Sequence, residues 1–178
     1  ANIAKKNGIK TLNKFFNLNT SKKLPNFKRK TDLIIAANAI CHIPQLNDLI
    51  KGVDNLLNKT GLFIFEEPYL GSMFEKTSYD QIYDEHIFMF SATSVKKIFN
   101  LHNFELINIV PQKTHGGSMR YVIGRKDCHR INKSVYKQLK FETRKNINTI
   151  KGCLKFKKNC ESSRRKLKKK IDKIIKSG

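Results

Sequence analysis

The residues best suited to chemistry gather between positions 66 and 90, in the segment EEPYLGSMFEKTSYDQIYDEHIFMF. This stretch holds six of the 14 acidic residues of a strongly basic chain. Tyr83, Glu85 and His86 place a phenol, a carboxylate and an imidazole within four residues. An imidazole oriented by a carboxylate is a competent general base near neutral pH. The alternative is a solvated helical turn in which His86 only flanks a helix.

Two further segments carry candidate groups. His42 follows the apolar run DLIIAANAI, and a polar residue just beyond a buried strand points into the crevice where open α/β sheets bind ligands. The segment HGGSMR at 115–120 combines paired glycines, which allow close backbone approach, with Ser118 and Arg120, which could hold a phosphate or hydroxyl group. The alternatives are a buried, hydrogen-bonded histidine and a tight hairpin turn with incidental polar residues.

Hydrophobic periodicity predicts the elements that position these groups. The apolar run at 32–40 predicts a central parallel strand buried on both faces, and Pro44 begins a helix with one apolar face. Gly61 is expected to end that helix, and 62–68 to form a second buried strand. A strand, a helix and a strand in this order indicate a sheet that is at least partly parallel.

The segments before this unit are read in the same way. Residues 1–9 predict the end of an amphipathic helix closed by Gly8, and 9–16 predict a short strand with alternating apolar positions. Residues 21–30 form a polar connector interrupted by Pro25.

The segments after it complete the pattern. Residues 69–90 follow neither period and predict an inserted lid or loop. Ser91 is expected to cap a helix, and two antiparallel strands then flank the THGGS turn. From Lys133 the pattern predicts a basic helix pair that packs on the domain.

The formal net charge of +22 is unevenly distributed along the chain. Residues 1–30 hold nine basic and no acidic residues, 31–124 hold seven basic and ten acidic, and 125–178 hold 20 basic and four acidic. A protein that binds a phosphate backbone would be expected to carry basic residues on its folded core as well. The charge is therefore interpreted mainly as solvated faces, and nucleic acid is not the expected partner. A polyanionic partner for the basic C-terminal helix stays as the alternative.

The cysteines and the apolar runs indicate the cellular compartment. None of the four cysteines forms a C-x-x-C pair, which argues against a structural metal site or a disulfide framework and suits a reducing cytoplasm. The longest apolar run, residues 33–43, is far shorter than the ~20 residues needed to cross a bilayer. We therefore expect a cytoplasmic protein that does not associate with membranes.

Three segments taken together resemble one family. DLIIAANAICHIPQLNDLIKGVDNLLNKTGLFIFEEPYL, YDQIYDEHIFMFS and THGGSMRYVIGR are similar, in order and spacing, to the sugar-nucleotide C-methyltransferases among the class I S-adenosylmethionine-dependent methyltransferases. The resemblance covers nearly the whole chain. It implies a partial Rossmann-like sheet, mostly parallel with a terminal antiparallel strand. It also implies methyl transfer from S-adenosylmethionine to a ring carbon of a nucleotide-linked keto-deoxysugar through a base-generated enolate.

The resemblance also implies roles for individual residues. His86 matches the family's proposed base, Glu85 and Tyr83 are orienting or oxygen-stabilising groups beside it, and His42 faces the sugar. Ala37 and Asn38 lie where the cofactor is approached. The residues implied in substrate binding belong to the glycine motif: His115, Gly116, Gly117, Ser118 and Arg120. Asp84 and Met119 depart from the family pattern without removing any of these groups.

Several parts of the family pattern are not found in these 178 residues. The sequence shows no strand followed by a glycine loop for the cofactor, no N-terminal cysteine-rich zinc region and no further Gly-rich α/β segment. We therefore expect a fragment, with residues 1–126 as a partial methyltransferase domain and 127–178 as a basic helical extension. Alone, it is expected to bind cofactor poorly and to be inactive. An O- or N-methyltransferase on the same fold is the alternative activity.

Overall fold

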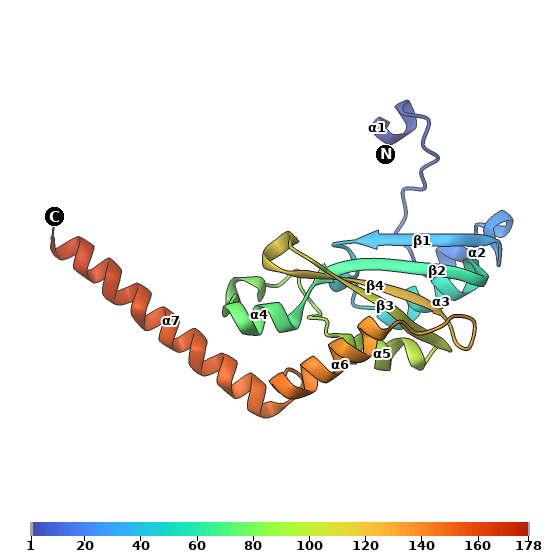
Figure 1. The fold of residues 1–178 in the computed structure, drawn as a ribbon. Coiled ribbons are helices and arrows are strands. Elements are labelled where there is room, and N and C mark those ends of the chain that lie inside the picture. The colour runs from blue at the N-terminus through green and yellow to red at the C-terminus, as the bar shows by residue number, and fades with distance from the viewer. Residues whose placement is uncertain (1, 178) are drawn as a thin grey trace.

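Four strands form one mixed sheet in the computed structural model, which describes residues 2–177 (Figure 1). The order across the sheet is β1-β2-β4-β3, and the strands are β1 (Thr31–Ala37), β2 (Leu57–Pro68), β3 (Phe104–Gln112) and β4 (Ser118–Arg125). β1 pairs parallel with β2, whereas β4, the last strand in the chain, is inserted between β2 and β3 and runs antiparallel to both. The predicted α/β fold is confirmed. The expected helical start at Ala1 lies outside the described residues.

Seven α-helices and four 3-10 turns accompany the sheet within residues 2–177. The helices are α1 (Asn2–Lys6), α2 (Leu18–Lys22), α3 (Leu46–Leu56), α4 (Leu70–Lys76), α5 (Ala92–Asn100), α6 (Lys133–Lys145) and α7 (Ile150–Lys176). The turns are η1 (Pro25–Phe27), η2 (Ile40–His42), η3 (Tyr79–Gln81) and η4 (Thr114–Gly116). The predicted helix after Pro44 and the Ser91 cap are confirmed, the latter as a reciprocal capping box with Ser94. Residues 69–90 were expected to be a lid or loop; the structure shows that 70–76 form the helix α4, and the rest of the segment is irregular apart from η3.

The core lies under β2, whose side chains alternate between the two faces of the sheet. Phe63 and Phe65 are buried on one face, where Phe65 contacts Phe99 of α5 and Tyr121 of β4 at ring-centroid distances of 5.6 and 5.0 Å. The same alternation directs Glu67 toward this buried face and Glu66 toward the opposite, more open one.

β1 is an edge strand, and the prediction of a central strand buried on both faces was wrong. Ile34 and Ala36 pack against the core, but Leu33 and Ile35 are 47% and 68% exposed. The run is apolar on both faces, and an apolar run alone does not tell how many of its faces other elements cover. The predicted strand at 9–16 was also wrong, because this segment pairs with no strand in the part of the chain that the structure describes.

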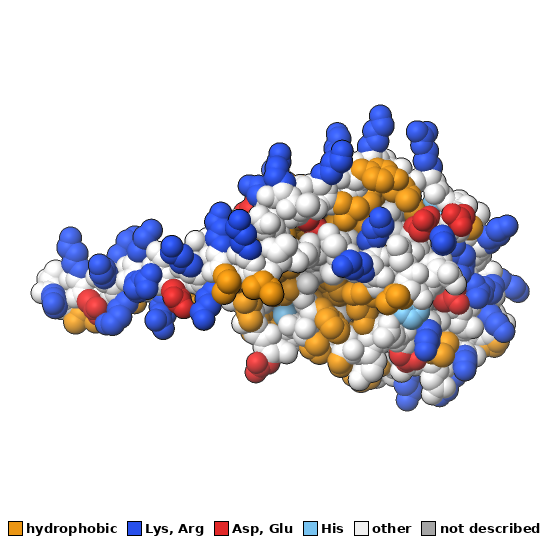
Figure 2. All heavy atoms as spheres, turned by 90° about the horizontal axis from the view of Figure 1, so that it is seen from below, with side chains coloured by type: hydrophobic (Ala, Val, Ile, Leu, Met, Phe, Trp, Pro, Cys, Tyr) orange, Lys and Arg blue, Asp and Glu red, His pale blue; other side chains and the backbone are white. Residues whose placement is uncertain are grey.

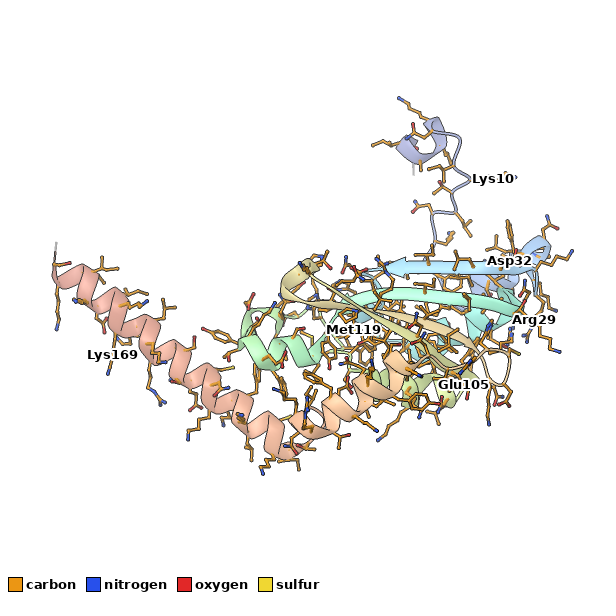
Figure 3. The ribbon with its side chains drawn as sticks, viewed as in Figure 1. Lys10, Arg29, Asp32, Glu105, Met119 and Lys169 are labelled. Carbon is orange, nitrogen blue, oxygen red and sulfur yellow. The ribbon has the colours of Figure 1, made fainter. Side chains whose placement is uncertain are left out.

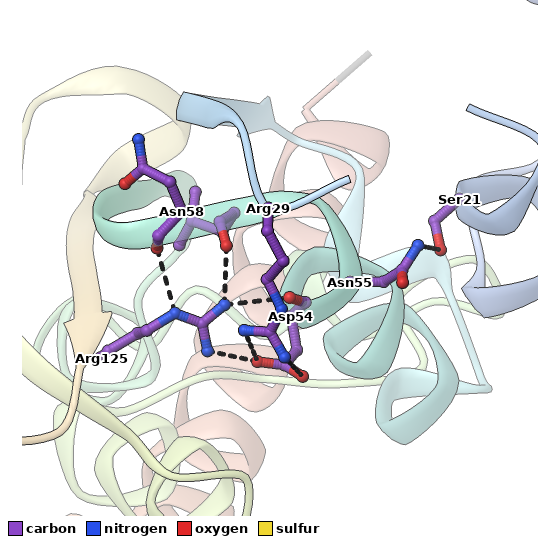
Figure 4. A network of polar contacts seen from close by, with 7 residues as sticks. Ser21, Arg29, Asp54, Asn55, Asn58 and Arg125 are labelled. Carbon is purple, nitrogen blue, oxygen red and sulfur yellow. Dashed lines mark hydrogen bonds and ion pairs between the residues drawn. The ribbon is translucent and has the colours of Figure 1, made fainter. Parts of the chain in front are cut away.

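The prediction that Gly61 ends α3 was wrong, because the helix ends at Leu56 and β2 begins directly at Leu57. The side chain of Arg125 satisfies the final carbonyls instead: it donates to the backbone oxygens of Asp54 and Leu57 at 2.9 and 2.7 Å (Figure 4). Arg125 also pairs with the carboxylate of Asp54, which Arg29 contacts from its other side. A cation near a helix C-terminus is favourable, so this guanidinium replaces the glycine cap.

Arg125→Ala is expected to lower the free energy of unfolding by about 2 kcal/mol, because it leaves the partly buried carbonyls of Asp54 and Leu57 without their charged donor. Urea unfolding of the chain measures the loss. Arg130 is exposed, so Arg130→Ala is the matched control and should change stability by less than about 0.5 kcal/mol. Equal effects of the two variants would refute the capping role of Arg125.

The two ends of the chain project from the domain. α1 stands above β1 on an extended segment that carries Lys10, and α7, which carries Lys169, extends away from the sheet (Figures 1 and 3). Figure 2 shows Lys and Arg side chains along the whole length of this helix. Phe156 stacks on Phe74 of α4 at 4.8 Å, but Leu167 and Ile175 are more than half exposed. The predicted packing of the basic helices on the domain therefore holds for α6 and the first turns of α7 only.

Glu142 anchors α6 to the domain through a fully buried carboxylate. It accepts hydrogen bonds from the backbone N–H groups of Ala92 and Thr93 at 2.7 and 2.9 Å, at the start of α5. The hydroxyl of Tyr69 donates to the same carboxylate at 3.0 Å. Burial and the charge of Glu142 raise the pKa of Tyr69 well above its ordinary value.

Among residues 2–177, no helix has the length and apolarity that a membrane crossing requires.

Candidate functional site

His42 stands at the carboxyl end of β1, in a turn that the neighbouring strand holds. After Ala37 the backbone of Asn38 adopts a positive φ of 49°, and its N–H donates to the carbonyl of Glu66. The chain then enters η2, the 3-10 turn that ends at His42. Nδ1 of His42 lies 2.7 Å from the carbonyl oxygen of Glu85. A carbonyl only accepts, so Nδ1 donates its proton in this contact, and in the neutral ring Nε2 then keeps its lone pair.

His86 is held by two hydrogen bonds within the insert between β2 and α5. Its Nδ1 lies 2.9 Å from the carbonyl of Gln81, and its Nε2 lies 2.8 Å from the hydroxyl of Tyr83. By the same reasoning, Nδ1 is protonated and Nε2 accepts from the phenol. The basic nitrogen of His86 is thus paired with Tyr83, whose ring is 47% exposed.

The structure brings His42 and His86 together from segments 44 positions apart in the sequence. Their ring centroids are 5.1 Å apart. The N–H of Phe88 donates to the carbonyl of Cys41 at 3.2 Å, so two hydrogen bonds join the η2 turn to the segment 85–88. The carboxylate of Glu85 is exposed, and it is the backbone carbonyl of this residue that orients an imidazole. A carboxylate partner for His86, expected from the sequence, is therefore replaced by the Gln81 carbonyl and the Tyr83 hydroxyl.

Cys41 and Glu67 lie beneath the histidines and were given no role in the sequence analysis. One carboxylate oxygen of Glu67 accepts from the N–H groups of Ala39 and Ile40 at 3.0 and 2.6 Å. Burial, followed by hydrogen bonding and the charge of Glu67, raises the pKa of the Cys41 thiol well above its ordinary value. Ligand atoms of Cys41, His42 and His86 lie within 4.8 Å of one another. Both ring nitrogens of His86 already have hydrogen-bond partners, so a metal ion would bind this ring only by displacing one of them.

The glycine motif forms the β3–β4 turn and packs against the start of the insert. The carbonyl of Gly117 accepts from the N–H of Tyr69 at 3.1 Å. Ser118 is buried and donates to the carbonyl of Thr114, whereas His115 is exposed with a positive φ of 48°. The motif therefore does not offer all of its predicted binding groups to a ligand.

Arg120 is engaged by a neighbouring strand. Its Nη2 pairs with Glu66 at 2.9 Å, and Glu66 also accepts from the hydroxyl of Thr114. The guanidinium is nevertheless 46% exposed and lies on the face of β2 opposite Glu67. An anionic ligand would reach Arg120 from this open face.

Gly117→Ala is expected to destabilise the chain by about 2–3 kcal/mol, and Gly116→Ala by about 1 kcal/mol. Gly117 has a φ of 129° and an added methyl group would collide with the side chain of Ser72, whereas an added methyl group at Gly116, with a φ of 73°, would meet nothing within 4 Å. Thermal unfolding of the two variants checks the order. A larger loss for Gly116→Ala would show that Ser72 does not restrict the turn.

A hollow of about 380 Å³ opens beside His42. Its walls come from the segment before β1 and from the turn that leads into α3: Phe15, Phe16, Asn17, His42, Ile43, Pro44, Gln45 and Asp48. Ala37 and Asn38, predicted to meet the cofactor, are exposed at the end of β1. The aromatic pair Phe15–Phe16 was assigned to a strand in the sequence analysis, and only the fold brings it next to His42.

Comparison with known proteins identifies the family. Residues 2–109 match the family model "Methyltransferase domain", and residues 113–178 match the "C-methyltransferase C-terminal domain". C-methyltransferase NovU from Streptomyces niveus is 28% identical over 119 residues, which are 67% of this chain and 28% of the relative. The chain thus spans well under a third of that protein.

A solved structure with the same fold was also found. A candidate type 11 methyltransferase from Sulfolobus solfataricus aligns with a TM-score of 0.51 and 16% identity, over 75% of this chain and 68% of that one. At this identity the likeness shows the fold alone. Since the first family model matches residues 2–109, which are more than half of the 178 residues, the chain belongs to the methyltransferase domain family.

Proposed function

We propose that this chain is part of an S-adenosylmethionine-dependent C-methyltransferase that acts on a ring carbon of a nucleotide-linked keto-deoxysugar. The observation that carries the proposal is the proximity of His42 and His86, whose ring centroids are 5.1 Å apart beyond the carboxyl end of β1. Open α/β sheets bind their ligands at this edge. The family matches and the similarity to the C-methyltransferase NovU support methyl transfer to carbon.

The chemistry of carbon methylation requires the groups found here. A carbon beside a ketone becomes a nucleophile only after it loses a proton, so a base must stand on that face with a donor for the developing enolate oxygen. In the proposed mechanism Nε2 of His86 takes the proton, and the hydroxyl of Tyr83 turns from His86 to the substrate. His42, whose Nδ1 is fixed by the carbonyl of Glu85, faces the sugar.

The cofactor is proposed to approach from the end of β1. Small side chains at Ala37 and Ala39 leave this strand end open, and the side chain of Asn38 is exposed there. When bound, S-adenosylmethionine supplies an activated methyl group, so the remaining task of the protein is alignment. The hollow beside His42, with Phe15 and Phe16 in its wall, adjoins this strand end and offers apolar contact to a ring system.

The destination of the methyl group tests the proposal directly. The longest native polypeptide that contains this chain is incubated with a nucleotide-linked 4-keto-deoxysugar and S-adenosylmethionine carrying a ¹³C-labelled methyl group. A carbon-bound methyl signal in the product is expected. An oxygen- or nitrogen-bound methyl group would instead support the alternative acceptors on the same fold.

A polyanion-binding role for the C-terminal helix is the second candidate function. α7 carries 12 basic and two acidic residues and projects from the domain. Binding of duplex DNA through this helix should weaken steeply between low and moderate salt, because bound counterions are released on association. Removal of 150–178 should abolish it. Salt-independent binding would exclude this role.

A further inference from the structure

We propose that Glu67 is the positioning residue that sets the place of His42 and, through it, of the segment that carries His86. Glu67 has no exposed surface, and one of its carboxylate oxygens accepts no N–H group among residues 2–177. A buried carboxylate is costly unless its bonds compensate for the lost hydration. The bonds that Glu67 does make go to a single turn, the one that ends at His42.

The first step of the coupling runs from Glu67 to η2. A single carboxylate oxygen accepts hydrogen bonds from the N–H groups of Ala39 and Ile40, the two residues at the start of this turn. These donors have no partner inside a 3-10 turn, because only later residues reach back to a carbonyl. Glu67 therefore does for this short turn what a capping side chain does for a helix. It also explains why the chain leaves β1 in one defined direction.

The second step runs from η2 to the insert. His42 donates from Nδ1 to the carbonyl of Glu85, and the carbonyl of Cys41 accepts from the N–H of Phe88. His86 lies between these two attachment points. A shift of the turn therefore moves both imidazoles, although Glu67 touches neither. The effect of Glu67 on catalysis rests on the proposed function, whereas its effect on the positions of the two rings does not.

The imidazole tautomers report the placement without any substrate. Long-range ¹H–¹⁵N spectra of the chain should show His42 protonated at Nδ1. In Glu67→Ala this ring should revert to the Nε2–H form that is usual in water, because the turn no longer holds Nδ1 against the Glu85 carbonyl. Glu67→Gln should restore the Nδ1–H form, since an amide oxygen still accepts both N–H groups. His102 is the internal control, because its ring contacts Asn47 and neither Glu67 nor the η2 turn, and its tautomer should be the same in all three proteins.

A second readout covers the case in which Glu67→Ala does not fold. The N–H of Ile40 is bonded to a charged oxygen at 2.6 Å, so its proton resonance should lie far downfield and should move upfield in Glu67→Gln. An unmoved Ile40 resonance in Glu67→Gln, or an unchanged His42 tautomer in a folded Glu67→Ala, would overturn the proposal.

Activity of the longest native polypeptide separates this proposal from the proposed function. Displacement of a catalytic group by about 1 Å costs roughly 10²-fold in rate, so Glu67→Ala should lower kcat by about that factor. A wild-type enzyme without C-methyl transfer contradicts the proposed function but leaves the tautomer result intact. Tautomer loss with an unchanged kcat contradicts the catalytic meaning of the position.

Discussion

Replacing Glu142 by alanine is expected to lower the free energy of unfolding by about 4 kcal/mol, the largest loss we predict for any single side chain here. The carboxylate is fully buried and binds two N–H groups at the start of α5, the hydroxyl of Tyr69 and the amide of Asn148. Alanine leaves the buried N–H group of Ala92 and the buried hydroxyl of Tyr69 without this acceptor. Since a domain of this size is stable by only about 5–15 kcal/mol, the variant should unfold at a markedly lower temperature.

Two further variants separate charge from shape. Glu142→Gln keeps an acceptor oxygen but removes the negative charge from the N-terminus of α5, and should cost about 2 kcal/mol. Glu161→Ala removes an exposed carboxylate from α7 and should change stability by less than about 0.5 kcal/mol. Chemical unfolding of the three variants gives the order. A Glu142→Ala protein as stable as the wild type would mean that α6 is not anchored by this residue.

His86→Gln is expected to lower kcat by about 10³-fold in the longest native polypeptide that contains this chain, because general-base catalysis contributes about 10²–10⁴-fold. Glutamine keeps a polar side chain beside Tyr83 and Gln81 but cannot accept a proton. The KM for S-adenosylmethionine should change little, since the imidazole is bonded within the insert rather than at the end of β1. Steady-state kinetics with separate titration of the two substrates measures both quantities.

The control for this variant is another histidine outside the proposed site. His102 follows α5 and contacts Asn47 at 2.9 Å. His102→Gln should keep kcat within about twofold of the wild type, which is below 0.5 kcal/mol. If His86→Gln were as active as His102→Gln, the proton would have to be removed by another group.

The fold could be predicted from the sequence where local patterns and tertiary contacts agree. The Ser91 cap and the apolar face of α3 are local, and both predictions were confirmed. The end of α3 was missed because Arg125, distant in the sequence, replaces the glycine cap. The edge position of β1 was missed for a related reason: an apolar run does not reveal which faces of a strand are covered.

In the candidate site, too, local features could be predicted from the sequence and tertiary contacts could not. His42 and His86 were each proposed from their sequence neighbours, and the structure places their rings in contact. Glu67 could have been distinguished from Glu66 by the two-residue period of a strand, which sends adjacent carboxylates to opposite faces. Its partners, the N–H groups of Ala39 and Ile40, could not be predicted, because they depend on how the chain turns after the neighbouring strand.

Solvent exchange of the proton beside the substrate ketone tests the central claim most directly. The longest native polypeptide that contains this chain is placed in deuterated water with the nucleotide-linked keto-deoxysugar and S-adenosylhomocysteine, so that deprotonation occurs without methyl transfer. Deuterium should enter the ring carbon with the wild type and at the uncatalysed rate with His86→Gln. Equal incorporation by both proteins, or none by an otherwise active wild type, would contradict the role of His86 as the base.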